Sequence, residues 1–178
     1  MYGRTLTPFY RQELGARRAA PVQVLVGARQ TGKTSLARSL AEDLAPERAV
    51  VLDLMRADDR QVYERDPGLL GRRLRAAGPD AGPRLVLIDE FQRVPALLDE
   101  IQSLVDSEPD RFRFFLTGSS SRTILRRGAN LLPGRSVWKA LFPVTPEESG
   151  APSFLDALAV ELGVRRPAPL ERPITTPP

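Results

Sequence analysis

The stretch that decides the fold covers residues 27–34 and reads Gly27-Ala28-Arg29-Gln30-Thr31-Gly32-Lys33-Thr34. Two glycines with four residues between them, followed by lysine and threonine, form the phosphate-binding P-loop pattern. Glycine permits backbone angles that a side chain would obstruct, so successive N–H groups can surround a polyphosphate. We therefore expect Lys33 to reach the β- and γ-phosphates and the Thr34 hydroxyl to bind Mg²⁺. The residues expected to contact the nucleotide are Gly27, Ala28, Arg29, Gln30, Thr31, Gly32, Lys33, Thr34 and Ser35.

The residues on either side of the P-loop favour this interpretation over a Gly-rich turn without a ligand. The apolar run 22–26 predicts a strand before the loop, and Leu36, Leu40 and Leu44 recur at helical spacing after it. The N-terminal end of such a helix carries partial positive charge, which favours an anion in front of it. A strand, a Gly-rich loop and a helix in this order predict a nucleotide-binding α/β protein.

A second motif, Leu85-Val86-Leu87-Ile88-Asp89-Glu90, has the Walker B pattern. Its apolar residues predict a buried central strand that delivers two carboxylates to its C-terminal end. We expect Asp89 to hold the Mg²⁺ shell and Glu90 to polarise the water that attacks the γ-phosphate.

Three more apolar runs, 50–54, 112–116 and 137–142, predict the remaining strands. Asp53 lies near the end of the first run and is a secondary site candidate, with a turn-forming aspartate as the favoured alternative. Small hydroxyl residues at 117–121 follow the second run. They could hydrogen-bond the attacking water or the γ-phosphate, or cap the next helix.

Helical patterns begin at three positions that contain proline, namely Thr7-Pro8, Asp66-Pro67 and Pro95. The first predicts a short docking helix within residues 1–20. The third is the most regular and has a core-facing stripe formed by Leu97, Leu98, Ile101, Leu104 and Val105. A modest amphipathic helix is expected over 153–162, and the Pro-rich tail that follows is expected to be disordered.

The composition excludes several kinds of chemistry. The sequence has no cysteine and no histidine, so disulfides, thiol nucleophiles, the usual zinc sites and histidine acid–base catalysis are excluded. Basic residues outnumber acidic ones by only 26 to 22, which is a weak signal for nucleic-acid binding. No apolar run reaches membrane-spanning length and no signal peptide is evident, so we expect a cytoplasmic protein without a membrane partner.

Taken together, the motifs resemble the AAA-type ATPase domain of a large prokaryotic family of predicted ATPases. The stretches that carry the resemblance are GARQTGKT, VLDL, LVLIDEFQRVPALLDEIQSLVD, FFLTGSSS and PGRSVWKALFP. The family signature is similar: G-x-R-Q-x-G-K-T, then D-E-x-Q with a nearby proline, T-G-S-S, and G-R before P-x-x-x-E. The resemblance covers residues 4–148. It implies a three-layer α/β P-loop NTPase with helices on both faces of a mostly parallel five-stranded sheet, ordered 5-1-4-3-2.

The resemblance also implies roles that the motifs alone leave open. Ser119 matches the sensor position that reads the γ-phosphate. Arg135 matches a charge-stabilising arginine that acts in its own subunit or across an interface, and a local salt bridge is the alternative for it. Arg29 and Gln92 match letters of the signature without an assigned role.

One departure from the family concerns the end of the chain. Family members usually continue into a substantial C-terminal domain, and AAA-type proteins carry a helical lid over the nucleotide. Here residues 153–162 are the only candidate for a lid before the Pro-rich tail. We therefore expect a truncated or degenerate member, or a separately expressed fragment, with the ATPase domain at 21–148, a short helix at 149–163 and a disordered tail at 164–178.

The sequence as a whole predicts an ATP-binding protein with Mg²⁺-dependent ATPase activity. Lys33, Glu90, Ser119 and Arg135 are the expected catalytic residues, and Thr34 and Asp89 the expected metal ligands. A homo-oligomer and a protein or nucleic-acid partner are further expectations. The alternatives are a nucleotide-binding switch that does not hydrolyse ATP, a small-molecule kinase and, last, a DNA-binding module. Glu90 argues against the kinase because it supplies an acid suited to activating water.

Overall fold

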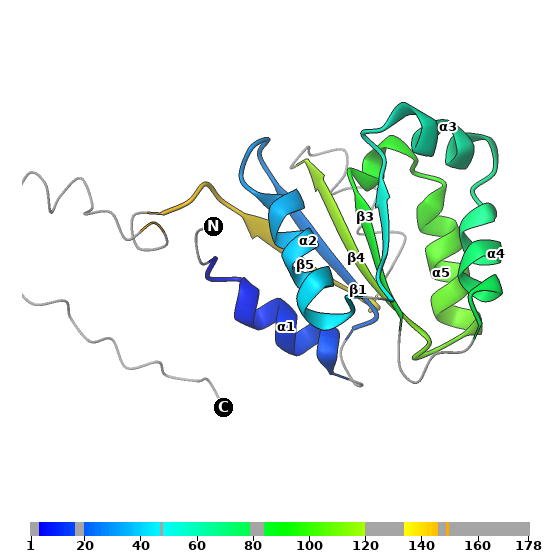
Figure 1. Cartoon of the computed structure of the whole chain (residues 1–178), viewed down its shortest axis with the longest axis horizontal. Helices are drawn as coiled ribbons and strands as arrows, with labels where there is room; N and C mark the ends of the chain where they lie inside the picture. Colours follow the sequence, from blue (N-terminus) through cyan, green and yellow to red (C-terminus); the bar gives the residue numbers. More distant parts are fainter. Residues whose placement is uncertain are drawn as a thin grey trace, which may run out of the picture. The chain divides into compact units, whose positions relative to one another are not determined.

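A parallel five-stranded sheet, in the order β2-β3-β4-β1-β5, forms the centre of the protein (Figure 1). The computed structural model describes residues 4–16, 20–46, 48–78, 84–119, 134–145 and 149. The strands are β1 (Val22–Gly27), β2 (Val50–Asp53), β3 (Arg84–Asp89), β4 (Phe112–Ser119) and β5 (Ser136–Leu141). All four neighbouring pairs are parallel. This order is the predicted 5-1-4-3-2 read from the other edge, so the P-loop NTPase fold is confirmed.

Helices cover both faces of the sheet (Figure 1). The helical segments are α1 (Thr7–Gly15), α2 (Lys33–Leu44), α3 (Ala57–Arg65), α4 (Leu69–Ala76), the short 3₁₀ helix η1 (Phe91–Arg93) and α5 (Leu97–Ser107). Buried side chains of α1 and α2 pack against one face of the sheet, and those of α3, α4 and α5 against the other. The result is the three-layer arrangement that the sequence predicted.

Side chains of the central strands alternate between the two helical layers. In β3, Val86 and Ile88 belong to the cluster under α4 and α5, whereas Leu85 and Leu87 belong to the cluster under α1 and α2. Successive side chains of a strand point to opposite faces, so a strand covered on both faces must be apolar throughout. The Walker B motif is continuously apolar because β3 is buried on both faces of the sheet.

The second strand and the segment after it differ from what the letters alone suggest. The apolar run 50–54 reads as a buried strand, but β2 lies at the edge of the sheet, where the implied strand order places it, and Val51 is 48% exposed. The sequence also gave no helix between this strand and Asp66, where the structure contains α3. This helix contributes only Tyr63 to the core, so its apolar signal is too weak for the periodicity to detect.

Three expectations lie outside the described residues: the helix over 153–162, the Pro-rich tail and the hydroxyl residues at 120 and 121. All the helices and strands given above belong to one compact unit, Gly3–Pro143. In the other unit, the Ser149 amide donates a hydrogen bond to the Thr145 carbonyl oxygen at 2.9 Å. Over the described residues, no helix is both long enough and apolar enough to cross a membrane.

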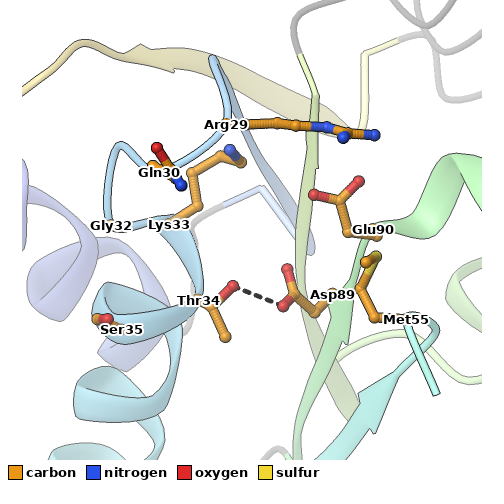
Figure 2. A pocket seen from close by; sticks show the side chains of 9 residues that line it. All are labelled: Arg29, Gln30, Gly32, Lys33, Thr34, Ser35, Met55, Asp89 and Glu90. Carbon is orange, nitrogen blue, oxygen red and sulfur yellow. Dashed lines mark hydrogen bonds between the residues drawn. The ribbon is translucent and has the colours of Figure 1, made fainter.

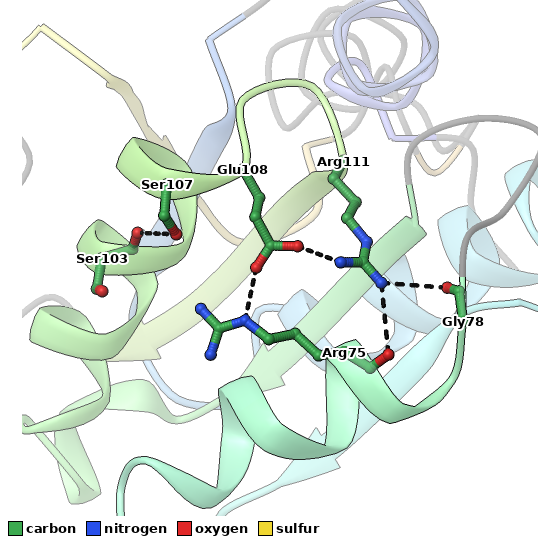
Figure 3. Close-up of polar contacts among 6 residues, drawn as sticks. All are labelled: Arg75, Gly78, Ser103, Ser107, Glu108 and Arg111. Carbon is green, nitrogen blue, oxygen red and sulfur yellow. Dashed lines mark hydrogen bonds and ion pairs between the residues drawn. The ribbon is translucent and has the colours of Figure 1, made fainter.

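Hydrogen bonds and ion pairs connect the C-terminal end of α4 to the C-terminal end of α5 (Figure 3). The Glu108 carboxylate accepts hydrogen bonds from Arg75, at 2.7 Å, and from Arg111. Arg111 also donates to the Gly78 carbonyl oxygen at 3.3 Å. Burial alone would raise the pKa of Glu108, but the hydrogen bonds and positive charges of the two arginines lower it overall.

We expect Glu108→Gln to lower the free energy of unfolding by about 1 kcal/mol at pH 7, because glutamine keeps the shape but loses the charge. A carboxylate with a lowered pKa in the folded state stabilises the fold above its unfolded pKa. That contribution is lost as the pH falls through the lowered pKa, so the difference between wild type and variant should shrink below about pH 4.5. Urea unfolding at pH 7 and at acidic pH measures both values.

Glu64→Gln is the matched control for this network. Glu64 pairs with Arg60 across one turn of α3 at 3.6 Å, and its side chain is 48% exposed. Exposed pairs of this kind contribute about 0.5 kcal/mol or less. Equal losses for the two variants, or a Glu108→Gln loss that does not change with pH, would contradict the stabilising role of the network.

Candidate nucleotide-binding site

A pocket of about 430 Å³ opens at the carboxyl edge of the sheet, between the P-loop and the end of β3 (Figure 2). The residues that line it are Arg29, Gln30, Gly32, Lys33, Thr34, Ser35, Met55, Asp89 and Glu90. Ligands of open α/β sheets bind at this edge, where the loops that follow parallel strands converge. Of the residues predicted from the two motifs, most therefore meet in one cavity.

The P-loop owes its path to two of its residues and to the close approach of β5. Gln30 and Gly32 have positive φ angles of 64° and 88°, which turn the chain tightly before α2 begins. A Cβ atom on Gly27 would collide with the backbone carbonyl oxygen of Leu141 on β5. Glycine is therefore required at position 27 for packing against the sheet, in addition to any contact with phosphate.

Lys33 lies in the first turn of α2 with its side chain folded over the loop. Its Nζ donates to the carbonyl oxygens of Gly27, at 3.0 Å, and Ala28, at 2.7 Å. The side chain is nearly buried, at 5% relative exposure. A buried ammonium requires compensating acceptors, and here the loop supplies them. The same group carries a third N–H, which it can donate to a phosphate oxygen in the pocket.

Arg4 holds the P-loop from outside the pocket. Its guanidinium donates to the Thr31 carbonyl oxygen at 3.0 Å and also to the carbonyl oxygen of Phe142, just beyond β5. The Thr31 hydroxyl donates to the Ala28 carbonyl oxygen at 3.0 Å. Both hydrogen bonds hold the loop through its carbonyl oxygens, which is compatible with a loop that presents its N–H groups to an anion.

Asp89 is oriented by hydroxyl groups from two other elements. The Thr34 hydroxyl donates to Oδ2 at 2.6 Å, and the Thr117 hydroxyl of β4 donates to Oδ1. The pairing of β3 with β4 explains the second contact, because Asp89 and Thr117 are partners in the register. Both oxygens of the carboxylate are thereby fixed next to the first turn of α2.

Thr34 and Asp89 together fit a Mg²⁺ ion. Mg²⁺ is usually held by one or two carboxylates together with phosphate oxygens and waters, and needs no larger protein cage. No group of three or more histidine, cysteine, aspartate or glutamate side chains in the described part of the chain could form such a cage. Asp89 and Thr34, one carboxylate and one hydroxyl at hydrogen-bond distance from each other, match a Mg²⁺ site that is completed by phosphate oxygens and waters.

Glu90 lines the opposite wall of the pocket, where the chain leaves β3. Its backbone is in the left-handed region, with φ 57° and ψ 45°. A non-glycine residue in this region costs about 1 kcal/mol and is typical of functional sites. Gln92 Nε2 donates to Glu90 Oε2 and also, at 3.3 Å, to the hydroxyl oxygen of Ser119. Ser119 ends β4 as the register partner of Gly27, so it lies beside the start of the P-loop.

The remaining predicted residues have different positions. Arg29 is exposed and reaches from the P-loop across the mouth of the pocket toward the Glu90 side (Figure 2). Gly27, Ala28 and Thr31 shape the loop and are not among the residues that line the pocket. Asp53 accepts a hydrogen bond from the Met55 amide at 3.0 Å, as the turn-forming alternative predicted.

Arg135 lies at the other end of the sheet. It directly precedes β5, and its carbonyl oxygen accepts a hydrogen bond from the first residue of β1, Val22. The P-loop follows the last residue of β1, so the strand length separates Arg135 from the pocket. Its guanidinium forms an ion pair with Asp106 of α5, which is the alternative that the sequence left open. A role for Arg135 in the pocket of its own chain has no support in this geometry.

Sequence reasoning gave no site role to Arg4 or Gln92, and it considered Thr117 only as one of several hydroxyl residues near the phosphate, without its hydrogen bond to Asp89. Thr117 could have been found by combining the implied strand order with the expectation that β3 and β4 end together. Gln92 carried a signal, because it belongs to the D-E-x-Q signature, but the letters did not say which atoms it contacts. Arg4 carried no signal, because no sequence pattern distinguishes it from the many other arginines of the chain.

Comparisons with known proteins agree with this geometry. A family described as "AAA domain" matches residues 19–149. Uncharacterised proteins from Mycobacterium tuberculosis and Mycobacterium bovis are each 32% identical over 136 residues, which cover 74% of this chain but only 27% of those proteins.

Two solved structures are similar in fold. PCH-2 from C. elegans has a TM-score of 0.56 at 16% identity, over 80% of this chain and 44% of that one. A DNA replication initiation factor has a TM-score of 0.53 at 11% identity, over 91% of this chain and 51% of the other. At these identities the similarity concerns the fold alone.

Proposed function

Because this chain belongs to the AAA domain family, we propose that it is an ATPase, which binds ATP with Mg²⁺ and hydrolyses it to ADP and phosphate. The observation that carries the proposal is the convergence of Lys33, Asp89 and Glu90 on one pocket. They come from α2, from the end of β3 and from the turn after it. An ammonium group, a metal-binding carboxylate and a second carboxylate are the groups that hydrolysis of a phosphoanhydride requires.

Each residue has a definite task in this proposal. Lys33 and the P-loop N–H groups bind the phosphates, and the Ser119 hydroxyl donates a hydrogen bond to a γ-phosphate oxygen. A Mg²⁺ ion held by Thr34 and Asp89 would supply positive charge to the phosphate oxygens. Glu90 accepts a proton from water as the water oxygen bonds to the γ-phosphorus and the bond to the β-phosphate oxygen breaks. Positioning and electrostatics account for most catalysis of this type, so histidine is not needed.

The test is a product assay on the purified wild-type chain with ATP, in the presence of Mg²⁺ and after its removal with EDTA. Equal amounts of ADP and free phosphate, formed only with Mg²⁺, are the expected result. ADP without free phosphate, in the presence of acceptor metabolites, would indicate a kinase. Measurable ATP affinity with no product would indicate a nucleotide-binding switch.

The predicted charge-stabilising role of Arg135 requires an assembly of at least two copies of the chain. Since Arg135 lies at the amino edge of the sheet, it could stabilise charge only in the pocket of a second copy of the chain. This predicts a homo-oligomer whose ATPase rate rises with protein concentration. The chain spans only 27% of the length of the mycobacterial relatives. A protein or nucleic-acid partner whose activity depends on ATP hydrolysis is a second prediction.

A further inference from the structure

Gln92 connects two residues that the proposed mechanism uses separately. Its side-chain Nε2 donates to Glu90 Oε2 and, at 3.3 Å, to Ser119 Oγ. Glu90 follows β3 and Ser119 ends β4, so the amide group spans the gap between two neighbouring strand ends. The sequence motif contains Gln92, but neither the motif nor the family comparison gives it a task.

The local backbone is built to bring this side chain back toward the site. The left-handed conformation of Glu90, at φ 57°, turns the chain from β3 into η1, so that a residue two positions later lies beside Glu90. Room for the side chain comes from Gly118 on β4. A Cβ atom there would lie 2.6 Å from Gln92 Oε1 and 2.9 Å from the Phe91 ring, too close for any side chain without displacing them.

The chemistry of the three groups fixes the direction of each hydrogen bond. An ionised carboxylate can only accept, so the NH₂ end of the Gln92 amide must face Glu90. The same nitrogen donates its second N–H to Ser119 Oγ. Among the described residues, Gln92 Oε1 is buried without a hydrogen-bond partner. A buried amide oxygen without a partner destabilises the folded state, and the two hydrogen bonds from the nitrogen offset this cost.

In this arrangement Ser119 keeps one hydrogen-bond donor and Glu90 keeps one carboxylate oxygen that Gln92 does not use. Ser119 accepts from Gln92, so its single hydroxyl proton is available to donate to a phosphate oxygen. Glu90 uses Oε2 for Gln92, so Oε1 is available to accept a proton from water. Neither side chain can rotate away without breaking a bond to the same amide group.

We propose that Gln92 is a positioning residue that aligns the Glu90 carboxylate with the Ser119 hydroxyl, so that contact with the γ-phosphate and activation of water occur in one geometry. The inference rests on the proposed ATPase function and extends it to a residue that is not among those lining the pocket. Displacing a catalytic group by about 1 Å can cost about 100-fold in rate. The effect of losing Gln92 should therefore appear in kcat and leave ATP binding unchanged.

The test compares Gln92→Met and Gln92→Asn with wild type, measuring kcat by phosphate release and the ATP dissociation constant by calorimetry. Methionine keeps the length and loses both donors, and asparagine keeps the amide but is one methylene too short. Both variants should lose about 10-fold or more in kcat while ATP affinity stays within about 2-fold. Gln61→Met, at an exposed position on α3, is the matched control and should behave as wild type.

A double-mutant cycle separates positioning from a general structural effect. If Gln92 acts through Ser119, the Gln92→Met substitution should cost much less in a Ser119→Ala background than in wild type. Wild-type kcat in both Gln92 variants, additive costs in the cycle, or equal losses of kcat and ATP affinity would overturn the inference while the ATPase function stands. No hydrolysis by wild type would overturn the proposed function, and the inference with it.

Discussion

Lys33→Ala should reduce the affinity for ATP by about 100-fold. In the structure, the Lys33 ammonium is held at the pocket by the carbonyl oxygens of Gly27 and Ala28. Its charge-assisted bonds to phosphate oxygens should contribute about 2 to 3 kcal/mol, and each 1.4 kcal/mol corresponds to about a tenfold change in affinity. Alanine removes the charge and all three donors but keeps the helical conformation of the first turn of α2. Titration calorimetry with Mg²⁺ and ATP measures the change.

The chain offers a matched control, because Lys139 is the one other lysine in the sequence. Lys139 lies on β5, with its Nζ 4.6 Å from the centre of the Phe9 ring, and it is not among the residues that line the pocket. Lys139→Ala should therefore leave ATP affinity unchanged and cost about 0.5 to 1 kcal/mol in the free energy of unfolding. Wild-type ATP affinity in the folded Lys33→Ala protein would show that the P-loop is not the phosphate site.

The fold could be predicted from the sequence wherever one physical cause dominated. Buried parallel strands must be apolar on both faces, so the runs that became β1, β3 and β4 were visible as continuous apolar stretches. In α5, the five stripe residues are all buried, because a helix that packs along one face needs that periodicity. The strand order itself came from the family resemblance, since no strand states in its own letters which neighbour it pairs with.

The prediction failed where burial is slight. α3 buries a single residue, Tyr63, so its helical character depends on signals weaker than the apolar pattern. Such signals were present, because Asp58 and Asp59 occupy the first turn and Arg65 the last, as the helix dipole favours. For β2, composition could not distinguish a central strand from one at the edge.

The candidate site divides in a similar way between residues that act through motifs and residues that act through contacts. The groups that line the pocket, such as Lys33 and Asp89, belong to the two motifs, whose residue spacings are those expected for phosphate and metal binding. The groups that hold them in place come from distant parts of the chain. Arg4 reaches the P-loop from 27 residues away, and Thr117 reaches Asp89 from 28. Such contacts depend on the packed tertiary structure, and single-sequence spacing does not contain them.

Glu90→Gln should preserve ATP binding and lower kcat by about 100-fold or more. General-base catalysis contributes about 10² to 10⁴ in rate, and an amide cannot accept the proton from water. The substitution is a close match in shape, and the glutamine carbonyl oxygen can still accept the hydrogen bond that Gln92 donates to Glu90 Oε2. The left-handed turn into η1 and the Ser119 contact should therefore persist. A single-turnover assay of phosphate release, beside the dissociation constant for ATP, measures both quantities.

Glu42→Gln provides the control for removing one carboxylate, because Glu42 is exposed on α2 and lies outside the residues that line the pocket. It should hydrolyse ATP at the wild-type rate. If Glu90→Gln also hydrolyses ATP at the wild-type rate, then Glu90 does not accept the proton and another group must activate the water. If it loses ATP affinity together with kcat, Glu90 instead maintains the pocket. Only loss of kcat with retained affinity separates the binding half of the site, built on the P-loop, from the hydrolytic half built on the ends of β3 and β4.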